Sequence, residues 1–358
     1  MGSAELAKSR PDGYTLGGGT ISTGISANGI LANGAVGSAS NITNGVLTVT
    51  ANEKANGFTY TVNKASLPGS SNDVTLKIID GLGNIGVTAS ADKLVITQPA
   101  FQSFSGIAGF GPVIAGNDLS AKAYDAAGNL LGEDTTVDAG GAYTINIRAD
   151  YAGAVLIEIT SRGAAADFVD EHAGANTNLN THTLRAVTSA PGVNNPTPGS
   201  VAAPVTVNIT NLTDLAAQKL LGANAKLITT VTALEVTAIN TQVAEKFLGV
   251  TADVTQQTPT FTVDANGASN AVNANRYGQV LKQLSDLASD PAYSGNINAA
   301  QAAVAQQITW TPVNPNTPAS LGADAQKLAL LAKVALNADA TTPPTGANVL
   351  TVQDLTDL

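Results

Sequence analysis

A glycine pattern at residues 81–86 has the spacing of a nucleotide-binding loop. Gly81, Gly83 and Gly86 match G-x-G-x-x-G, in which the glycines begin a helix whose N-terminal N–H groups hold a pyrophosphate. Here the pattern leads into residues 87–97, whose β-branched side chains are typical of a strand. The same stretch contains Asp-Gly and Gly-Asn pairs, which favour hairpin turns. We therefore predict a β-turn here and no dinucleotide site.

Two histidines are the candidates for a transition-metal site. His172 follows Asp170 and Glu171, but no second ligand stands four residues away on a helix, as such sites often require. The segment has the composition of a polar loop. We predict that His172 and His182 are surface residues.

Oxygen ligands of the kind that Ca²⁺ prefers are spread over two successive turns. They are Asp125, Asn129, Asp134 and Asp138. The twelve-residue EF-hand spacing with its terminal Glu is absent. We predict structural turns at these positions, with Ca²⁺ binding as the alternative.

Catalytic motifs are missing from the sequence. It contains no G-x-S-x-G, no H-E-x-x-H and no P-loop, and with no Cys it has no thiol chemistry. We therefore predict that the protein is not an enzyme and that it has no catalytic residue and no resident cofactor.

Sparse charge is the main feature of the composition. Of 358 residues only 12% are charged, and 17 basic against 27 acidic residues give a net charge of −10. An acidic chain lacks the basic surface that binds nucleic acid or anionic membranes, and no run of about 18 apolar residues predicts a membrane span. The absence of Cys fits exported bacterial proteins. We expect an extracellular or cell-surface location.

The N-terminal segment, residues 1–45, is rich in Gly, Ser and Asn. Two interpretations remain open: a flexible leader, or a strand that pairs with the open sheet edge of a neighbouring molecule. Four side chains would share one face of such a strand, and with Ile30 they form the candidate assembly strand: Ile21, Thr23, Ile25, Ala27 and Ile30.

The rest of the chain predicts a multidomain β plus α protein. Residues 46–99 form one β module and residues 100–190 a second, because short β-branched runs alternate with turn residues. The expected strands are 46–50, 58–62, 74–79, 94–97, 118–124, 130–131, 143–147 and 154–159.

A proline-rich linker at 191–204 leads into a mainly helical domain, residues 205–358. There the apolar period changes to that of helices, which are expected at 212–221, 227–247, 277–287 and 324–336. Gly222, Gly249 and Pro291 are the expected stops.

Residues 107–160 carry a family resemblance. A D-x-x-G turn at Asp125–Gly128 precedes a G-x-Y-x-I strand at Gly141–Ile145. This resembles the transthyretin-like or carboxypeptidase-regulatory-like modules of bacterial surface proteins. The resemblance implies an Ig-like antiparallel β-sandwich and structural motifs without catalytic residues. Residues 207–215 and 275–281 are similar to the helical regions that follow such modules. Residues 7–16 resemble a short segment of tripartite tricarboxylate solute-binding proteins.

These observations lead to one functional hypothesis. We expect an exported structural protein whose partners are copies of itself, assembled into a filament or surface layer by strand addition.

Two alternatives remain. One is a monomeric adhesin that recognises other surface proteins or glycans through exposed Phe101, Phe104 and Phe110, although burial of these rings under the second β module is the favoured prediction. The other is a periplasmic solute-binding protein, which a ligand would stabilise.

Overall fold

The computed structural model describes residues 100–193, 200–222, 225–227, 230–311 and 315–357, together with the backbone of eight short strands before residue 100. It divides into two units. Unit 1 contains Met1–Gln102, Ile147–Tyr151 and Gly192–Ala203, and unit 2 contains Ser103–Asn146, Ala152–Pro191 and Pro204–Leu358. The candidate assembly strand lies outside the described residues.

Unit 1 contains a four-stranded antiparallel sheet in the order β1-β4-β8-β7. Its strands are β1 (Ala35–Val36), β4 (Thr59–Asn63), β8 (Lys93–Thr97) and β7 (Gly86–Ala89). Two further pairs are β2 (Asn41–Thr43) with β3 (Val46–Thr48) and β5 (Ile79–Asp80) with β6 (Gly83–Asn84). The strands predicted at 46–50, 58–62 and 94–97 are confirmed, whereas only Ile79 of the strand predicted at 74–79 lies in a described strand.

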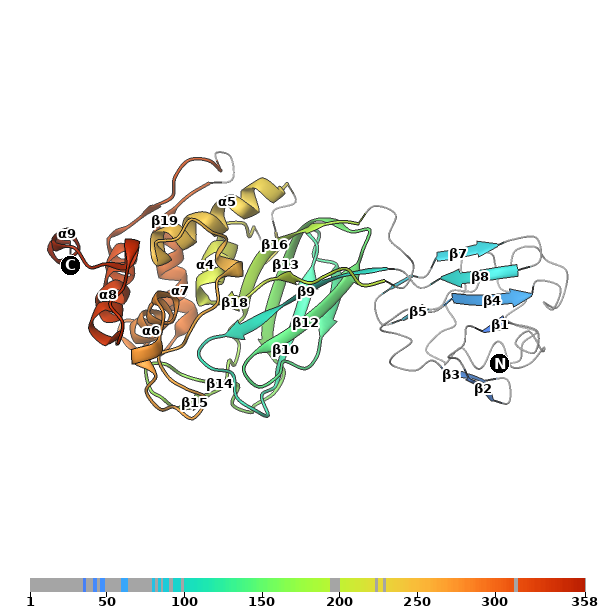
Figure 1. Cartoon of the computed structure of the whole chain (residues 1–358), viewed down its shortest axis with the longest axis horizontal. Coiled ribbons are helices and arrows are strands. Elements are labelled where there is room, and N and C mark those ends of the chain that lie inside the picture. Colours follow the sequence, from blue (N-terminus) through green and yellow to red (C-terminus); the bar gives the residue numbers. More distant parts are fainter. Residues whose placement is uncertain are drawn as a thin grey trace. The chain divides into compact units, whose positions relative to one another are not determined.

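Two larger sheets carry the β part of unit 2 (Figure 1). The first has the order β11-β10-β13-β16, and the second has the order β12-β9-β17, with β18 also paired to β9. The bounds are β9 (Phe101–Gly109), β10 (Leu119–Tyr124), β11 (Leu130–Asp134), β12 (Ala142–Arg148), β13 (Ala152–Ser161), β16 (Leu184–Pro191), β17 (Val205–Thr206) and β18 (Ile209–Thr210). The predicted β10, β11, β12 and β13 are confirmed. Side chains alternate along β12 as expected, with Tyr143, Ile145 and Ile147 buried.

The motif residues of the resemblance have structural roles. Asp125 Oδ1 accepts from the backbone N–H groups of Ala127 and Asn129, and Gly128 has a φ of 81°. The Tyr143 hydroxyl donates to the Val207 carbonyl. Gly141 has a φ of 86°, and a Cβ there would lie 2.0 Å from the Ala108 oxygen. Glycine is therefore required at this turn by both conformation and space.

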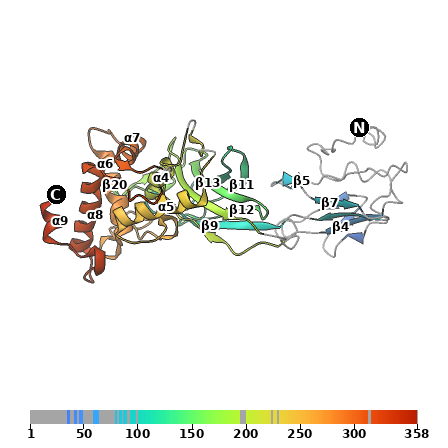
Figure 2. The same cartoon turned by 90° about the horizontal axis from the view of Figure 1, so that it is seen from above.

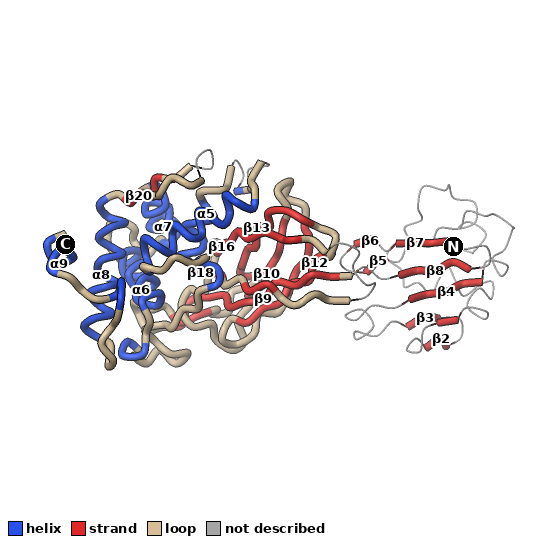
Figure 3. The backbone as a smooth tube through the Cα atoms, turned by 45° about the horizontal axis from the view of Figure 1, so that its top comes forward, coloured by secondary structure: helices blue, strands red, loops and turns tan. Residues whose placement is uncertain are grey.

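The helices of unit 2 all follow its two larger sheets along the chain, and Figure 3 shows them in blue. They are α4 (Asn211–Gln218), α5 (Ala233–Val243) with a π-helical extension η4 (Ala244–Leu248), α6 (Arg276–Ser289), α7 (Ile297–Gln306), α8 (Ala323–Asp339) and α9 (Val352–Thr356). Short elements complete unit 2: β14 (Phe168–Val169), β15 (Asn176–Thr177), β19 (Ile308–Thr309), β20 (Ser320–Leu321), η5 (Val254–Gln256), η6 (Ala271–Asn273) and η7 (Gly346–Asn348).

The predicted helices are confirmed with shifted boundaries. The helix expected from residue 227 begins only after Thr232, whose side chain forms a capping box with Glu235. It ends where predicted, because Gly249 adopts the left-handed conformation with a φ of 70°. Helix α7, which is rich in Ala and Gln, was not predicted.

Helices and sheet share one hydrophobic core. Leu156 of β13 and Val187 of β16 pack in the same cluster as Leu212 and Leu215 of α4, and as Phe247. Helix α6 lies between α7 and α8 and packs against both (Figure 2). The predicted domain boundaries, at residue 190 after the second β module and at residue 204 before the helical domain, remain predictions. Within the described residues, no helix combines the length and apolarity that crossing a membrane requires.

Two adjacent glycines test the role of the turn before β12. Gly140 has a φ of 89° and open space around it, since a Cβ there would meet no atom within 4 Å, whereas a Cβ on Gly141 would meet the Ala108 carbonyl. We expect Gly140→Ala to lower the free energy of unfolding by about 1–2 kcal/mol, from backbone strain alone. Gly141→Ala adds the collision, and we expect it to cost roughly 2 kcal/mol more. Urea unfolding of both variants measures the difference, and equal losses would contradict the proposed close approach.

Candidate functional site

A cavity of about 440 Å³ opens on unit 2 between the β14–β15 segment and the junction of α6 with α7. Its floor is buried and contains Phe110, Phe168, Leu179, His182 and Ala288. Its rim is polar, with exposed or half-buried amide and hydroxyl side chains: Thr177, Asn178, Asn180, Thr181, Ser289, Asn296 and Asn298. An apolar floor with a polar rim is a common arrangement in small-molecule sites.

His182 is buried in the floor, with 4% of its surface exposed. Its ring meets Phe110 edge-on at 5.0 Å between centroids, and its Nδ1 contacts Asn298 Oδ1. Burial lowers the pKa of His182 to about 4, so the ring is neutral. The prediction of a surface residue is wrong for His182, because the residues preceding β16 close over Phe110. It is correct for His172, whose side chain is 49% exposed.

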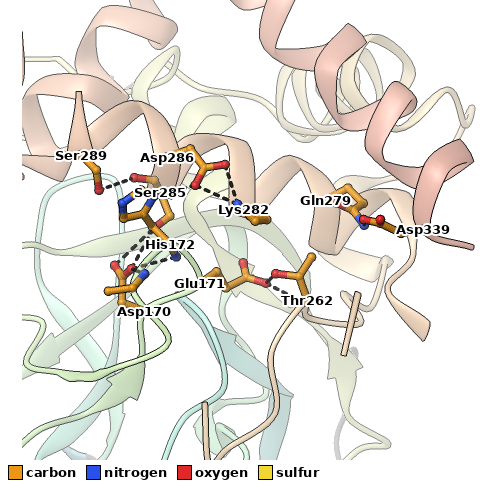
Figure 4. A network of polar contacts seen from close by, with 11 residues as sticks. Asp170, Glu171, His172, Thr262, Gln279, Lys282, Ser285, Asp286, Ser289 and Asp339 are labelled. Carbon is orange, nitrogen blue, oxygen red and sulfur yellow. Dashed lines mark hydrogen bonds and ion pairs between the residues drawn. The ribbon is translucent and has the colours of Figure 1, made fainter. Parts of the chain in front are cut away.

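A polar network lies beside the cavity (Figure 4). Ser285 Oγ donates to Asp170, at 3.2 Å from either carboxylate oxygen, and accepts from the His172 backbone N–H at 3.3 Å. The His172 ring contacts Asp286 Oδ1 at 2.8 Å through Nδ1, and Lys282 pairs with the same carboxylate at 2.7 Å. The network therefore ties the loop before β15 to one face of α6.

The residue types of this network are those of a serine hydrolase, but their connections are different. A catalytic serine needs an imidazole nitrogen to remove its proton. Here the Ser285 hydroxyl is directed to Asp170, and the His172 ring is paired with Asp286. Among the described residues, no ring nitrogen of a histidine bonds to Ser285. The arrangement holds two segments together and lacks the proton transfer that acyl chemistry requires.

Glu171 occupies the other side of the same loop and is 2% exposed. One carboxylate oxygen accepts from the Thr262 N–H at 2.7 Å and from its hydroxyl at 2.9 Å. The other oxygen has no partner among the described residues. Burial raises the pKa of Glu171 to about 7, although the hydrogen bonds from Thr262 oppose this shift.

The structure distributes the four candidate Ca²⁺ ligands over three turns, with Asp125 and Asn129 together in the first. Asp125 accepts three hydrogen bonds within its own turn, from Ala127 and from both the backbone and side chain of Asn129. Asp134 stands at the far end of the five-residue β11, about 13 Å along the strand. Its oxygens accept from the N–H groups of Thr136 and Thr144, and Asp138 forms a third turn with Gly141. Across the described part of the chain, no three acidic or histidine side chains gather as a metal site would require.

Two other sequence-based predictions have clear outcomes. Phe101, Phe104 and Phe110 are all buried, so they form no exposed aromatic patch. The glycine pattern leads into strands, since β6 pairs with β5 and β7 pairs with β8. The β-turn expected at residues 81–86 is therefore consistent with the described strands, because Gly83 and Gly86 lie in strands and begin no helix.

Sequence reasoning missed most residues of the cavity. Ser285 and Asn298 are more than 110 residues from their partners His172 and His182. The one local signal is the i,i+4 spacing of Lys282 and Asp286, which predicts an ion pair on a helix but no cavity.

Comparison of the chain with family models, curated proteins and solved structures found no match. Function is therefore inferred from the chain's own residues and geometry.

The buried carboxyl of Glu171 predicts a pH dependence of stability. In the unfolded chain it ionises near pH 4.5 and in the fold near pH 7, so between these values the folded protein binds more protons. This contribution to stability is present at low pH and is lost as the pH rises from about 4.5 to about 7. Glu171→Gln removes the titration and keeps an oxygen for Thr262. We expect this variant to match the wild type near pH 4, below the pKa of the unfolded chain, and to exceed it near pH 8 by on the order of 3 kcal/mol.

Urea unfolding of the wild type and Glu171→Gln at a series of pH values measures this difference. Glu133→Gln, at an exposed position, is the matched control for loss of one carboxylate. A constant difference between wild type and Glu171→Gln across this pH range would contradict the prediction.

Proposed function

We propose that the protein is an exported bacterial surface or extracellular structural protein that assembles with copies of itself by strand addition. The observation that carries this proposal is the distribution of sheet edges. In unit 2, side chains bond backbone groups on the edge strand β16 and at the corner of β11 and β12, whereas β7 of unit 1 is an edge strand whose one partner among the described strands is β8.

The covered edges of unit 2 support the proposal by restricting where another chain can pair. On β16, the Arg185 carbonyl accepts from the Thr213 hydroxyl at 2.9 Å, and the Val187 carbonyl accepts from the Asn240 amide at 3.0 Å. At the corner of β11 and β12, Asp134 accepts from the Thr144 N–H at 2.8 Å. Side chains placed in this way prevent unwanted edge-to-edge pairing.

The proposed class is a transthyretin-like β-sandwich followed by helices. Support comes from the two motif turns at Asp125–Gly128 and Gly141–Ile145, whose residues serve turns and packing. If the seven strands of the two sheet paths are lettered A to G in chain order, as β9, β10, β11, β12, β13, β16 and β17, the sheets group as CBEF and DAG. Immunoglobulin constant domains group as ABED and CFG, so we favour the transthyretin-like part of the resemblance.

Sparse charge also supports self-association. Only 12% of the residues are charged, so the electrostatic repulsion between closely packed copies is small. The adhesin alternative loses its proposed surface, because the three phenylalanines are buried. The residues that resemble solute-binding proteins lie outside the described part of the chain.

Deletion of residues 17–35 tests the proposed donor strand. We expect the full chain to form filaments or sheets in negative-stain electron microscopy, and the deletion variant to remain monomeric by size exclusion. The backbone hydrogen bonds supplied by the donor are then missing. A variant with residues 17–35 in shuffled order, so that the alternation is lost, is the matched control and should also fail to assemble. Assembly of the deletion variant, or a full chain that stays monomeric at all concentrations, would contradict the proposal.

Addition of a synthetic peptide shows whether the deletion variant fails to assemble because it lacks the donor strand or because it is misfolded. A peptide of residues 17–35 should bind the deletion variant and compete with assembly of the full chain, whereas the shuffled peptide should do neither. Isotope-edited infrared spectroscopy would detect the added strand. Equal binding of both peptides would contradict strand addition.

A further inference from the structure

The lining of the cavity in unit 2 has three properties that together indicate a class of ligand. Its side chains come from segments that are far apart in the sequence, namely residues 168–182 and residues 285–298, together with Phe110. Its volume of about 440 Å³ lies within the range of about 300–1,000 Å³ that is usual for small-ligand sites. Its function is independent of the proposed assembly.

Charge is the first property. No Lys or Arg is among the described residues that line the cavity, and the ring of His172 is paired with Asp286, so an anionic ligand would find no free counter-charge there. The acidic side chain of the lining, Asp170, is already bonded to the N–H groups of His172 and Ala173 and to the Ser285 hydroxyl. Burial keeps His182 neutral. The partial positive charge at the N-terminal end of α7, which also lines the cavity, disfavours a cation, and the Asp170 carboxylate of the same lining disfavours an anion. An uncharged ligand fits this lining best.

Hydrogen-bonding capacity is the second property. An amide oxygen can only accept, so the contact between Asn298 Oδ1 and His182 Nδ1 places the proton on Nδ1. The buried ring thereby holds the Asn298 amide with its NH₂ group free to donate. In the segment before β16, which also lines the cavity, the Asn180 side chain donates to the Asn178 carbonyl at 3.0 Å, which leaves Asn180 Oδ1 as an acceptor. A hydroxyl group, which both donates and accepts, satisfies such a pair.

The third property is the floor. The chain has few aromatic residues, yet Phe110 and Phe168 meet here edge to face, with centroids 4.7 Å apart. Phe110 also contacts the His182 ring. Phe110 is 7% and Phe168 2% exposed, so the floor offers a small apolar area to C–H groups, while the rim offers amides and hydroxyls. A compact molecule with an apolar ring face and hydroxyls around its edge matches both.

We infer that this cavity binds a small, uncharged, hydroxyl-rich ring: a hexose, either free or at the end of a glycan. Asn298 and Asn180 bind its hydroxyls, and Phe110 and Phe168 form the surface beneath it. His182 is a positioning residue that orients the Asn298 amide.

The test uses the full chain and a panel of methyl hexosides, namely glucoside, galactoside, mannoside and fucoside, observed by saturation-transfer NMR. Each neutral sugar is compared with its amino sugar or uronic acid where these exist, which have similar rings but opposite charges. We expect at least one neutral glycoside to bind more tightly than both charged counterparts. An array of immobilised glycans then distinguishes a free sugar from a glycan end.

Asn298→Ala should weaken binding of that glycoside by at least about tenfold, because one ligand hydrogen bond is lost. The α7 cap is kept, since it is formed by Asn296. Asn180→Ala gives a second, independent variant in the segment before β16. Asn266→Ala, at an exposed turn outside the cavity, is the matched control and should bind like the wild type. No binding of any neutral probe at tens of millimolar, tighter binding of a charged analogue, or binding unchanged in both rim variants would each overturn the inference.

Discussion

The contact between α4 and the edge of β16 is the constraint on which unit 2 depends. Thr213 bonds the Arg185 carbonyl, and the Arg185 guanidinium joins Glu158 at 3.1 Å and the buried Asp214 at 3.3 Å. Burial raises the pKa of Asp214 to about 6 while Arg185 opposes the shift. A buried carboxylate without its cation is costly, so the helix is held on the sheet in one position.

The segments that precede and follow this contact in the chain are positioned by it. Residues 205–210 complete the second sheet as parallel partners of β9 and pass directly into α4, whose cap is Thr210. The Thr210 hydroxyl also bonds Tyr277 at 2.6 Å and so fixes the start of α6. Two turns farther along, α6 presents Ser285 to Asp170. The cavity thus depends on a contact between α4 and β16 to which its lining residues do not themselves contribute.

The sequence predicted those elements whose buried face has a regular period. Strand β12 alternates cleanly and was predicted, whereas β9 was missed because it buries polar Gln102, whose amide bonds the carbonyls of Arg148 and Tyr151. Burial of a polar side chain depends on partners that the sequence does not reveal. The cavity could not be predicted for the same reason. His182 lies in a segment with the composition of a loop, and it is buried because Phe110 and Asn298 of α7 contact its ring.

Sparse charge connects the proposed assembly with the proposed ligand. A chain that replaces Lys and Glu by Asn, Ser and Thr keeps its hydrogen-bonding capacity but loses long-range electrostatic attraction and repulsion. Between copies, this removes the repulsion that would oppose close packing. Within the cavity, it leaves amides that recognise hydroxyls at short range. Selectivity there comes from the fixed direction of a few groups, which is why the buried ring behind Asn298 matters more than any charge near it.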